Sequence, residues 1–208
     1  MFDRLCPRLS AHRDRLSRLW LPRPGRLGPL LAALAACLAL QTKAAPYDTI
    51  VGGAEARLML RGHDPVAYFA SGKPTPGGAA IKTNFDGVTY RFASDANRLE
   101  FLKNPLKYVP QFGGFCTNSL VYALPFAGDP ATWKIIDGRL YLFGGEAQRR
   151  YFLMDDDNNL ALARNYWKTE VEGGNAIFQR YRRLLFRVPH YRSDLDLEID
   201  WRQHNVAR

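Results

Sequence analysis

Cys116 is the residue of this chain with the greatest capacity for chemistry. The chain has three cysteines, at positions 6, 37 and 116, and the first two lie in a segment typical of an export leader. A single remaining cysteine has no partner for an internal disulfide bond. Cys116 is therefore a free thiol, an intermolecular disulfide partner, a metal ligand or a small buried residue.

Residues 1–44 have the order of features found in a secretory signal peptide. Arginines are frequent up to position 26, an uncharged Leu/Ala-rich run extends from Leu27 to Leu40, and small residues follow. This run of fourteen residues is shorter than the roughly eighteen that indicate a membrane-spanning helix. The spacing of Thr42 and Ala44 predicts cleavage after Ala44, and we therefore expect an exported, periplasmic protein.

A lipoprotein signal is the alternative interpretation of the same segment. Leu34-Ala35-Ala36-Cys37 resembles the sequence in front of a lipidated cysteine, so Cys37 would become a lipid anchor. Leu38-Ala39-Leu40 continues the apolar run past Cys37, which favours an unmodified position. The first expectation is therefore a soluble exported chain, with an anchored form as the alternative.

The leader also accounts for most of the positive charge. The whole chain has a formal charge of +9, and residues 1–44 contribute +6 of it through eight basic and two acidic residues. The remaining +3 does not indicate a nucleic-acid-binding surface, so no nucleic-acid partner is expected. Residues 45–208 are sufficient for one domain with a hydrophobic core.

Two hairpin-and-helix patterns organise the middle of the chain. Asp86-Gly87 and Asp137-Gly138 each separate two β-prone runs, and such a pair predicts a type I′ turn because both residues need positive φ. A helix is expected after each hairpin, the first with Ser94 as its N-cap and with Leu99 and Leu102 on one face. The expected strands are 81–85, 88–92, 133–136 and 139–143, and the expected helices are 95–103 and 145–154.

The two patterns align with each other at an offset of 51 residues. Between 85–102 and 136–153, eight of the eighteen aligned positions are identical. Neither pattern can bury its apolar face alone, so we expect a pseudo-repeat around a shared core, with chance similarity as the alternative. The predicted fold class is α+β, with small antiparallel β-hairpins packed with helices. The Cys116 loop lies between the two patterns, where we expect a cleft.

The other segments give weaker signals. Residues 66–69 are expected to form a short buried strand or a turn, and 155–170 a helix that Gly173-Gly174 ends. Residues 177–187 predict a basic amphipathic helix with Phe178, Tyr181 and Leu185 on one side. We expect its basic face to be solvated, with peripheral membrane association as the alternative. The last residues alternate acidic and apolar side chains, which predicts a short strand or a loose tail.

Four motifs, taken in order, resemble the exported branch of the YHS domain family. They are Gly62-His63-Asp64-Pro65-Val66-Ala67-Tyr68-Phe69, Tyr90-Arg91-Phe92-Ala93-Ser94, Asn104-Pro105-Leu106-Lys107-Tyr108 and Gly113-Gly114-Phe115-Cys116. The resemblance covers about residues 57–170, so we expect a YHS-like domain over 45–172 and a separate C-terminal part over 173–208. It implies a small α+β module from a family associated with heavy metals, copper especially.

The resemblance and ligand chemistry together define a candidate metal site. In the better-understood branches a cysteine pair or triplet supplies thiolate ligands, whereas here Ala67 stands at the position of the opening cysteine. Cu(I) prefers thiolate, imidazole and thioether ligands, which points to Cys116 and His63 with Met59. A tetrahedral zinc site would need Asp64 as well. The expected function is therefore copper or zinc binding in the cell envelope.

Other functions use the same residues. In a thiol-dependent enzyme or redox protein, His63 would lower the pKa of Cys116 and Asp64 would orient the imidazole. In a structural role, His63 would make a turn hydrogen bond and Cys116 would pack in the core. A third alternative is a module that binds a non-metal ligand or a protein through its aromatic side chains. Those side chains are Tyr68, Phe69, Phe112, Phe115 and Tyr122.

Overall fold

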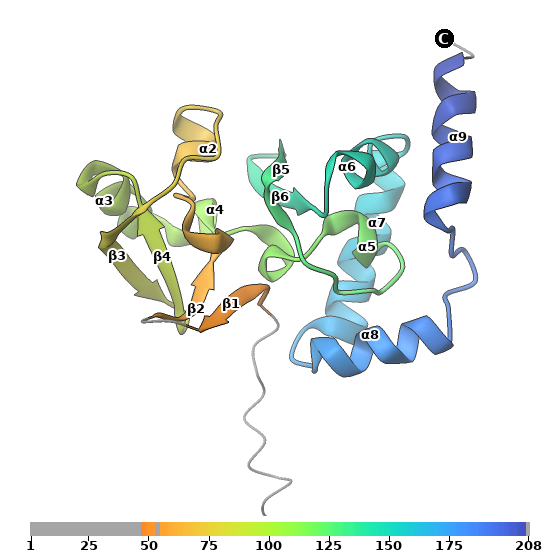
Figure 1. Cartoon of the computed structure of the whole chain (residues 1–208), viewed down its shortest axis with the longest axis horizontal. Helices are drawn as coiled ribbons and strands as arrows, with labels where there is room; N and C mark the ends of the chain where they lie inside the picture. The colour runs from red at the N-terminus through yellow and green to blue at the C-terminus, as the bar shows by residue number, and fades with distance from the viewer. Residues whose placement is uncertain (1–46, 53–54, 207–208) are drawn as a thin grey trace, which may run out of the picture. The chain divides into compact units, whose positions relative to one another are not determined.

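The computed structural model describes residues 47–52 and 55–206 of the chain (Figure 1). The chain divides into a unit of residues 1–42 and a unit of residues 43–208, and every described residue belongs to the second. The predicted signal peptide, its cleavage site after Ala44 and the alternative lipidation site Cys37 lie outside the described residues. Within the described ranges, no helix has both the length and the apolar character needed to cross a membrane.

A four-stranded sheet forms the first half of the described part. Its strand order is β1-β2-β4-β3, and β3 pairs with β4 in an antiparallel hairpin whereas β2 runs parallel to β4. Asp86 and Gly87 have φ of 51° and 68°, so the predicted hairpin turn is confirmed. The strands are β1 (Thr49–Gly52), β2 (Glu55–Met59), β3 (Gly78–Phe85) and β4 (Val88–Phe92).

Short helices accompany this sheet. Ser94 caps α3 as predicted, because its Oγ accepts the backbone N–H of Asn97 at 3.2 Å. The predicted apolar face of α3 is wrong, since Leu99 and Leu102 are exposed and Phe101 is buried instead. The helices of this half are the 3₁₀ turn η1 (Leu60–Gly62), α2 (Ala67–Ala70), α3 (Asp95–Lys103) and α4 (Pro105–Tyr108).

The second half repeats this arrangement. A two-stranded antiparallel hairpin turns at Asp137 and Gly138, which have φ of 50° and 69°, and a helix follows it. This confirms the second predicted hairpin and the α+β fold class. The elements are η2 (Gln111–Gly114), α5 (Thr117–Leu120), β5 (Asp129–Ile136), β6 (Arg139–Phe143), α6 (Glu146–Phe152), α7 (Asp156–Tyr166) and the π-helical turn η3 (Trp167–Val171).

The similarity between the halves extends upstream of the hairpins. Each half has a 3₁₀ turn, then a one-turn helix, then a hairpin, then a longer helix. Each 3₁₀ turn contains three successive residues with positive φ, at 60–62 in the first half and at 112–114 in the second. Residues other than glycine rarely have positive φ, so three positive values in succession are uncommon. Their occurrence at matching places in the two halves favours an internal repeat over chance similarity.

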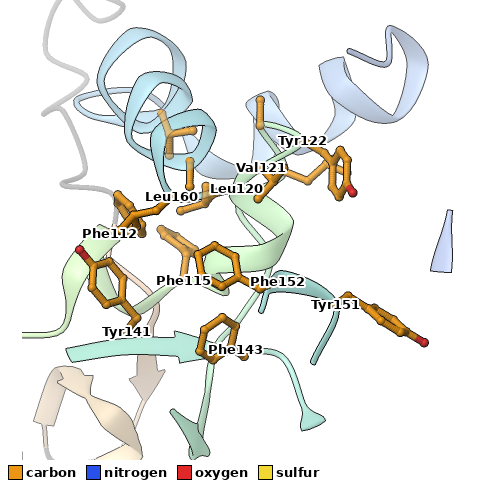
Figure 2. Packing of buried hydrophobic residues seen from close by; sticks show 14 of the residues in the cluster. Phe112, Phe115, Leu120, Val121, Tyr122, Tyr141, Phe143, Tyr151, Phe152 and Leu160 are labelled. Atoms are coloured by element: carbon orange, nitrogen blue, oxygen red, sulfur yellow. The ribbon is translucent and has the colours of Figure 1, made fainter. Parts of the chain in front are cut away.

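The hydrophobic core consists of two clusters, whereas the sequence predicted one shared core. Both clusters draw on β6, because successive side chains of a strand point to opposite faces. Leu140 and Leu142 pack with the first half, and Tyr141 and Phe143 pack with the second half. Figure 2 shows the second cluster, in which Phe143 and Phe152 lie with ring centroids 5.3 Å apart. Each half therefore has its own core, with β6 as the common wall.

The C-terminal region is helical and joins the second core. Its helices are α8 (Ala176–Leu185) and α9 (Asp194–Val206), so the predicted strand or loose tail is wrong. Ser193 caps α9, since its Oγ accepts the N–H of Asp196 at 3.2 Å. The helical period then places Leu197 and Trp201 on one side, where Leu197 is buried in the second cluster.

A charged cluster fastens α9 to α6. Glu198 accepts hydrogen bonds from Arg202 at 2.7 Å and from the Tyr151 hydroxyl at 2.8 Å, and it also pairs with Arg150. These contacts, led by Arg202, lower the pKa of Glu198 to about 2. The guanidinium of Arg150 lies 4.4 Å from the ring centre of Trp201, so the same arginine joins both helices.

Candidate functional site

Asp64 is a structural carboxylate whose two oxygens are both occupied. Oδ1 accepts the backbone N–H groups of Val66 at 2.8 Å and Ala67 at 3.4 Å, which fixes the start of α2. Oδ2 accepts the N–H of Ala93 at 2.8 Å and the side-chain amide of Asn97 at 2.6 Å. This capping explains why residues 66–69 form a turn and a one-turn helix instead of a strand. Asp64 is fully buried and thereby ties α2 to α3.

His63 and Met59 also have structural contacts. The Nδ1–H of His63 donates to the carbonyl of Leu60 at 2.9 Å, which closes the η1 turn. Met59 is 1% exposed and belongs to the first hydrophobic cluster. A Cβ atom on Gly114 would lie 3.2 Å from the Met59 sulfur, so the thioether fills the space beside that glycine.

Cys116 is buried at the start of α5. Its own N–H donates to the carbonyl of Phe126 at 2.9 Å, and its relative exposure is 1%. Burial raises the pKa of the thiol, and hydrogen bonds from the backbone N–H groups of Ser119, Gly144 and Asn118 only partly offset this. The side chain is therefore a protonated thiol at neutral pH.

Cys116 occupies the place in the second half that Asp64 occupies in the first. Asp64 accepts the N–H groups two and three residues after it, and the N–H groups of Asn118 and Ser119, at the same spacing after Cys116, act on its thiol to lower the pKa. The residue after the hairpin matches as well: Ala93 donates its N–H to Asp64 in one half, and the N–H of Gly144 lowers the pKa of the Cys116 thiol in the other. Both halves therefore build the same three-donor cradle, once around a carboxylate and once around a thiol.

The two cradles differ in what lies in front of them. In the first half, the amide of Asn97 closes the cradle by donating to Asp64. The matching residue in the second half, 51 positions later, is Gln148. Gln148 lines a pocket of about 480 Å³ together with Cys116 and Gly144. We call this space the Cys116 pocket, and it lies in front of the cradle whose counterpart in the first half is closed by Asn97.

Polar and apolar groups both line the Cys116 pocket. Its polar residues are Asn118, Ser119, Gln148, Arg192 and Asp194, and its large apolar or aromatic residues are Tyr122, Leu124, Phe126, Tyr191 and Leu197. Arg192 is paired with Asp200 at 2.6 Å, so part of its charge is already balanced. Burial raises the pKa of Tyr122 to about 12, which keeps its hydroxyl protonated. Such a lining suits a small organic molecule with a few hydrogen-bonding groups.

The pocket lies elsewhere than the sequence predicted. A cleft was expected between the two halves, but the lining runs from Cys116 to Leu197 and includes no residue of the first half. The C-terminal segment supplies Tyr191, Arg192, Asp194 and Leu197. The offset of 51 would have identified Gln148 from Asn97, whereas no signal in the sequence placed the C-terminal segment against Cys116.

The four residues predicted as metal ligands have other contacts in the structure. Both oxygens of Asp64 accept N–H donors, and Met59 packs in the first cluster while Cys116 faces the pocket. Among the described residues, no group of three or more His, Cys, Asp or Glu side chains is placed to hold a metal ion. Copper or zinc binding through Cys116 stays a prediction.

The geometry also gives no pairing of thiol and imidazole. His63 does not line the Cys116 pocket, and its Nδ1–H is directed to Leu60. The aromatic surface suggested from the sequence lies mainly in the core, since Tyr68, Phe112, Phe115 and Tyr122 are each at most 8% exposed. The chemically available feature is therefore the pocket in front of Cys116.

Alkylation of Cys116 is expected to be slow in the folded protein. Because burial raises the pKa of the thiol and leaves it 1% exposed, its reaction with iodoacetamide at neutral pH should be at least about 100-fold slower than that of free cysteine. The rate is followed by mass spectrometry of the peptide that contains Cys116, which separates it from the other two cysteines. Unfolding in urea should restore the normal rate, and rapid reaction of the folded chain would contradict this structure of the site.

Comparisons with known proteins give no family for this chain. No family model, no curated protein and no solved structure matches it. The resemblance to the YHS domain family therefore stays a prediction that rests on the four motifs.

Proposed function

We propose that this protein is an exported binding module for a small organic molecule, and that the molecule binds in the Cys116 pocket. The observation that carries the proposal is the difference between the two cradles. The first half closes its cradle with Asp64 and Asn97, whereas the second half leaves about 480 Å³ in front of Cys116. A volume of this size lies within the range of ligand pockets in proteins.

The lining supports a ligand of mixed character. Tyr122, Tyr191 and Leu197 offer apolar surface, while Gln148 and Asn118 offer amide groups that both donate and accept hydrogen bonds. Arg192 and Asp194 carry opposite charges at the same pocket. A neutral or zwitterionic molecule with one apolar part therefore matches the pocket better than a strongly charged one.

Native mass spectrometry of the protein purified from its own cells, without chelators, tests this function. We expect one organic molecule per chain in the wild-type protein. Gln148→Trp directs a large indole toward the pocket and should abolish the adduct. Gln203→Trp makes the same exchange at an exposed position of α9 that does not line the pocket, and it should retain the adduct.

Two results would overturn the proposal. One is an adduct that persists in Gln148→Trp, because the molecule would then bind elsewhere. The other is stoichiometric copper or zinc in the wild-type protein that is lost in Cys116→Ser, which would establish the metal function predicted from the sequence. Elemental analysis of the same samples provides this second measurement.

A further inference from the structure

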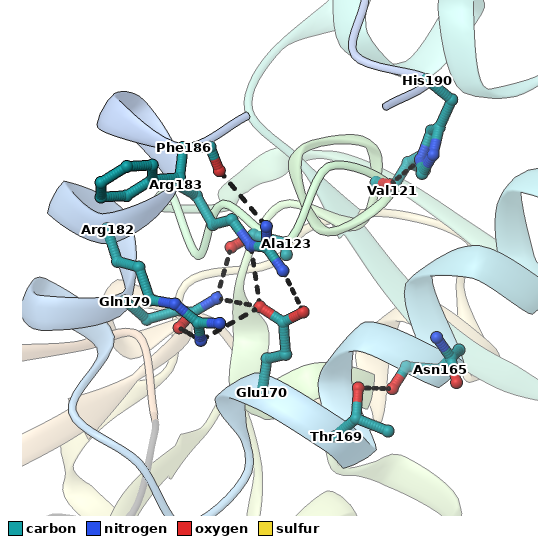
Figure 3. Close-up of polar contacts among 10 residues, drawn as sticks. All are labelled: Val121, Ala123, Asn165, Thr169, Glu170, Gln179, Arg182, Arg183, Phe186 and His190. Atoms are coloured by element: carbon teal, nitrogen blue, oxygen red, sulfur yellow. Dashed lines mark hydrogen bonds and ion pairs between the residues drawn. The ribbon is translucent and has the colours of Figure 1, made fainter. Parts of the chain in front are cut away.

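The helix α8 is docked on the protein through its polar side. Gln179 is 4% exposed, and its side-chain amide donates to Glu170 at 2.7 Å and to the carbonyl of Ala123 at 3.3 Å. Arg183 donates through Nε to Glu170 at 2.8 Å and forms a second, closer contact with the same carboxylate. Figure 3 shows Gln179 and Arg183 converging on Glu170 from α8.

The apolar side of α8 faces away from these contacts. At 100° per residue, positions 177, 178, 181, 184 and 185 fall within an arc of about 120°, opposite Gln179. Their relative exposures range from 42% at Leu184 to 77% at Leu185, and Phe186 just after the helix is 70% exposed. We call these six side chains the α8 apolar stripe: Ile177, Phe178, Tyr181, Leu184, Leu185 and Phe186.

This orientation is the reverse of what an amphipathic helix on a globular domain normally adopts. Such a helix turns its apolar stripe to the core and its polar face to water. Here the polar face makes the contacts with the protein, so the helix is held firmly while six large apolar side chains face solvent. Contiguous exposed apolar surface of this kind marks an interaction site.

The charges around the stripe indicate what covers it. Residues 173–193 contain five arginines and no aspartate or glutamate. Glu170 pairs with Arg182 and Arg183, and Asp200 pairs with Arg192, so a net positive charge remains beside the stripe. Arg180 and Arg182 lie about 40° beyond the two edges of the stripe, and Arg187 follows it as an exposed residue. Arg180 is partly buried and donates to the carbonyl of Pro125 at 2.8 Å, whereas Arg182 and Arg187 are exposed. Exposed arginines beside an apolar stripe match the boundary between acyl chains and anionic headgroups, because their long stems lie along apolar surface while the guanidinium stays in water.

We propose that α8 and Phe186 bind the surface of a membrane that contains anionic phospholipids. The apolar stripe enters the boundary between headgroups and acyl chains, and the exposed arginines Arg182 and Arg187 contact the phosphates. The ten residues of the helix span about 15 Å, which is too short to cross a membrane. The helix therefore lies along the membrane surface. This inference rests on α8 alone and does not depend on a ligand in the Cys116 pocket.

The first test places a fluorescent reporter on the stripe. Phe178→Trp and Leu106→Trp each introduce a tryptophan at a highly exposed position, one on the stripe and the other on α4. On vesicles of equal parts phosphatidylcholine and phosphatidylglycerol with brominated acyl chains, the signal added by Phe178→Trp should be quenched. The signal added by Leu106→Trp should not be quenched. Because the readout is specific to the position, it holds whether or not the leader has been removed.

The second test measures affinity. Phe178→Asp combined with Leu185→Asp should weaken binding to the same vesicles at least tenfold, whereas Leu99→Asp with Leu106→Asp should leave it unchanged. All four positions are more than half exposed, so the folded state should persist in both variants. Binding should also weaken with added salt and on vesicles of phosphatidylcholine alone.

Other outcomes would overturn the inference. Equal quenching of the two introduced tryptophans would show that α8 is not the contact. A blue shift for Phe178→Trp that rises with protein concentration in the absence of vesicles would instead assign the stripe to a second copy of the chain.

Discussion

Asp64→Ala is expected to lower the free energy of unfolding by about 3–5 kcal/mol. The substitution leaves the buried N–H of Val66 and the partly buried N–H of Ala93 without an acceptor, and it also removes the acceptor of the Asn97 amide. It therefore releases both the start of α2 and the connection between α2 and α3. Equilibrium unfolding in urea, followed by circular dichroism, measures the change as a lower midpoint.

Asp95→Ala is the matched control for Asp64→Ala. Asp95 lies in the first turn of α3, where its carboxylate is 70% exposed and pairs with Arg98 at 3.1 Å. An exposed pair of this kind contributes about 1 kcal/mol or less, so the control should change stability little. A loss below about 1 kcal/mol for Asp64→Ala would show that the cradle does not hold the first half together.

Gly77→Ala is expected to cost about 3 kcal/mol, and Gly78→Ala less than about 1 kcal/mol. A Cβ atom on Gly77 would lie 2.5 Å from the backbone carbon of Arg91 and 2.6 Å from the backbone nitrogen of Phe92. Strand β4 would have to move, because backbone atoms cannot rotate away as a side chain does. For Gly78, the nearest atom within 4 Å is the carbonyl oxygen of Phe92 at 3.9 Å, which is ordinary contact.

The second half provides an independent check of the same effect. Gly128 matches Gly77 at the offset of 51, and a Cβ atom there would lie 2.3 Å from the carbonyl oxygen of Gly114. Gly128→Ala should therefore destabilise the protein about as much as Gly77→Ala in the same thermal or urea unfolding assay. Tolerance of alanine at both positions would show that the two close approaches are absent from the protein in solution.

Local signals in the sequence were sufficient for the hairpins and most helices. Asp-Gly between β-prone runs specifies a turn with positive φ at both positions, and Ser94 specifies a helix start through one hydrogen bond. The alternation of acidic and apolar residues in the last segment misled, because it fits a strand as well as a helix. The segment is a helix because Ser193 caps its start, and because Leu197 and Trp201, four residues apart on one side, both pack against the second cluster.

The candidate site was harder to predict, because it depends on contacts between distant segments. Cys116 was identified from the sequence as the key residue, but its equivalence to Asp64 was not. The offset there is 52 instead of 51, and the two residues differ in type. The same holds for α8: the sequence predicted its amphipathic character, whereas only the structure shows that Gln179 and Arg183 are the docked side.

The outer wall of the Cys116 pocket is the connection between α8 and α9. Tyr191, Arg192 and Leu197 lie on this connection and its continuation, so the pocket exists only while that part of the chain is docked. A molecule bound there would contact the residues around Cys116 on one side and the segment from Tyr191 to Leu197 on the other, and would hold the two together. By thermodynamic linkage, its binding free energy adds to the free energy that keeps the last segment attached, and detachment of that segment would release it.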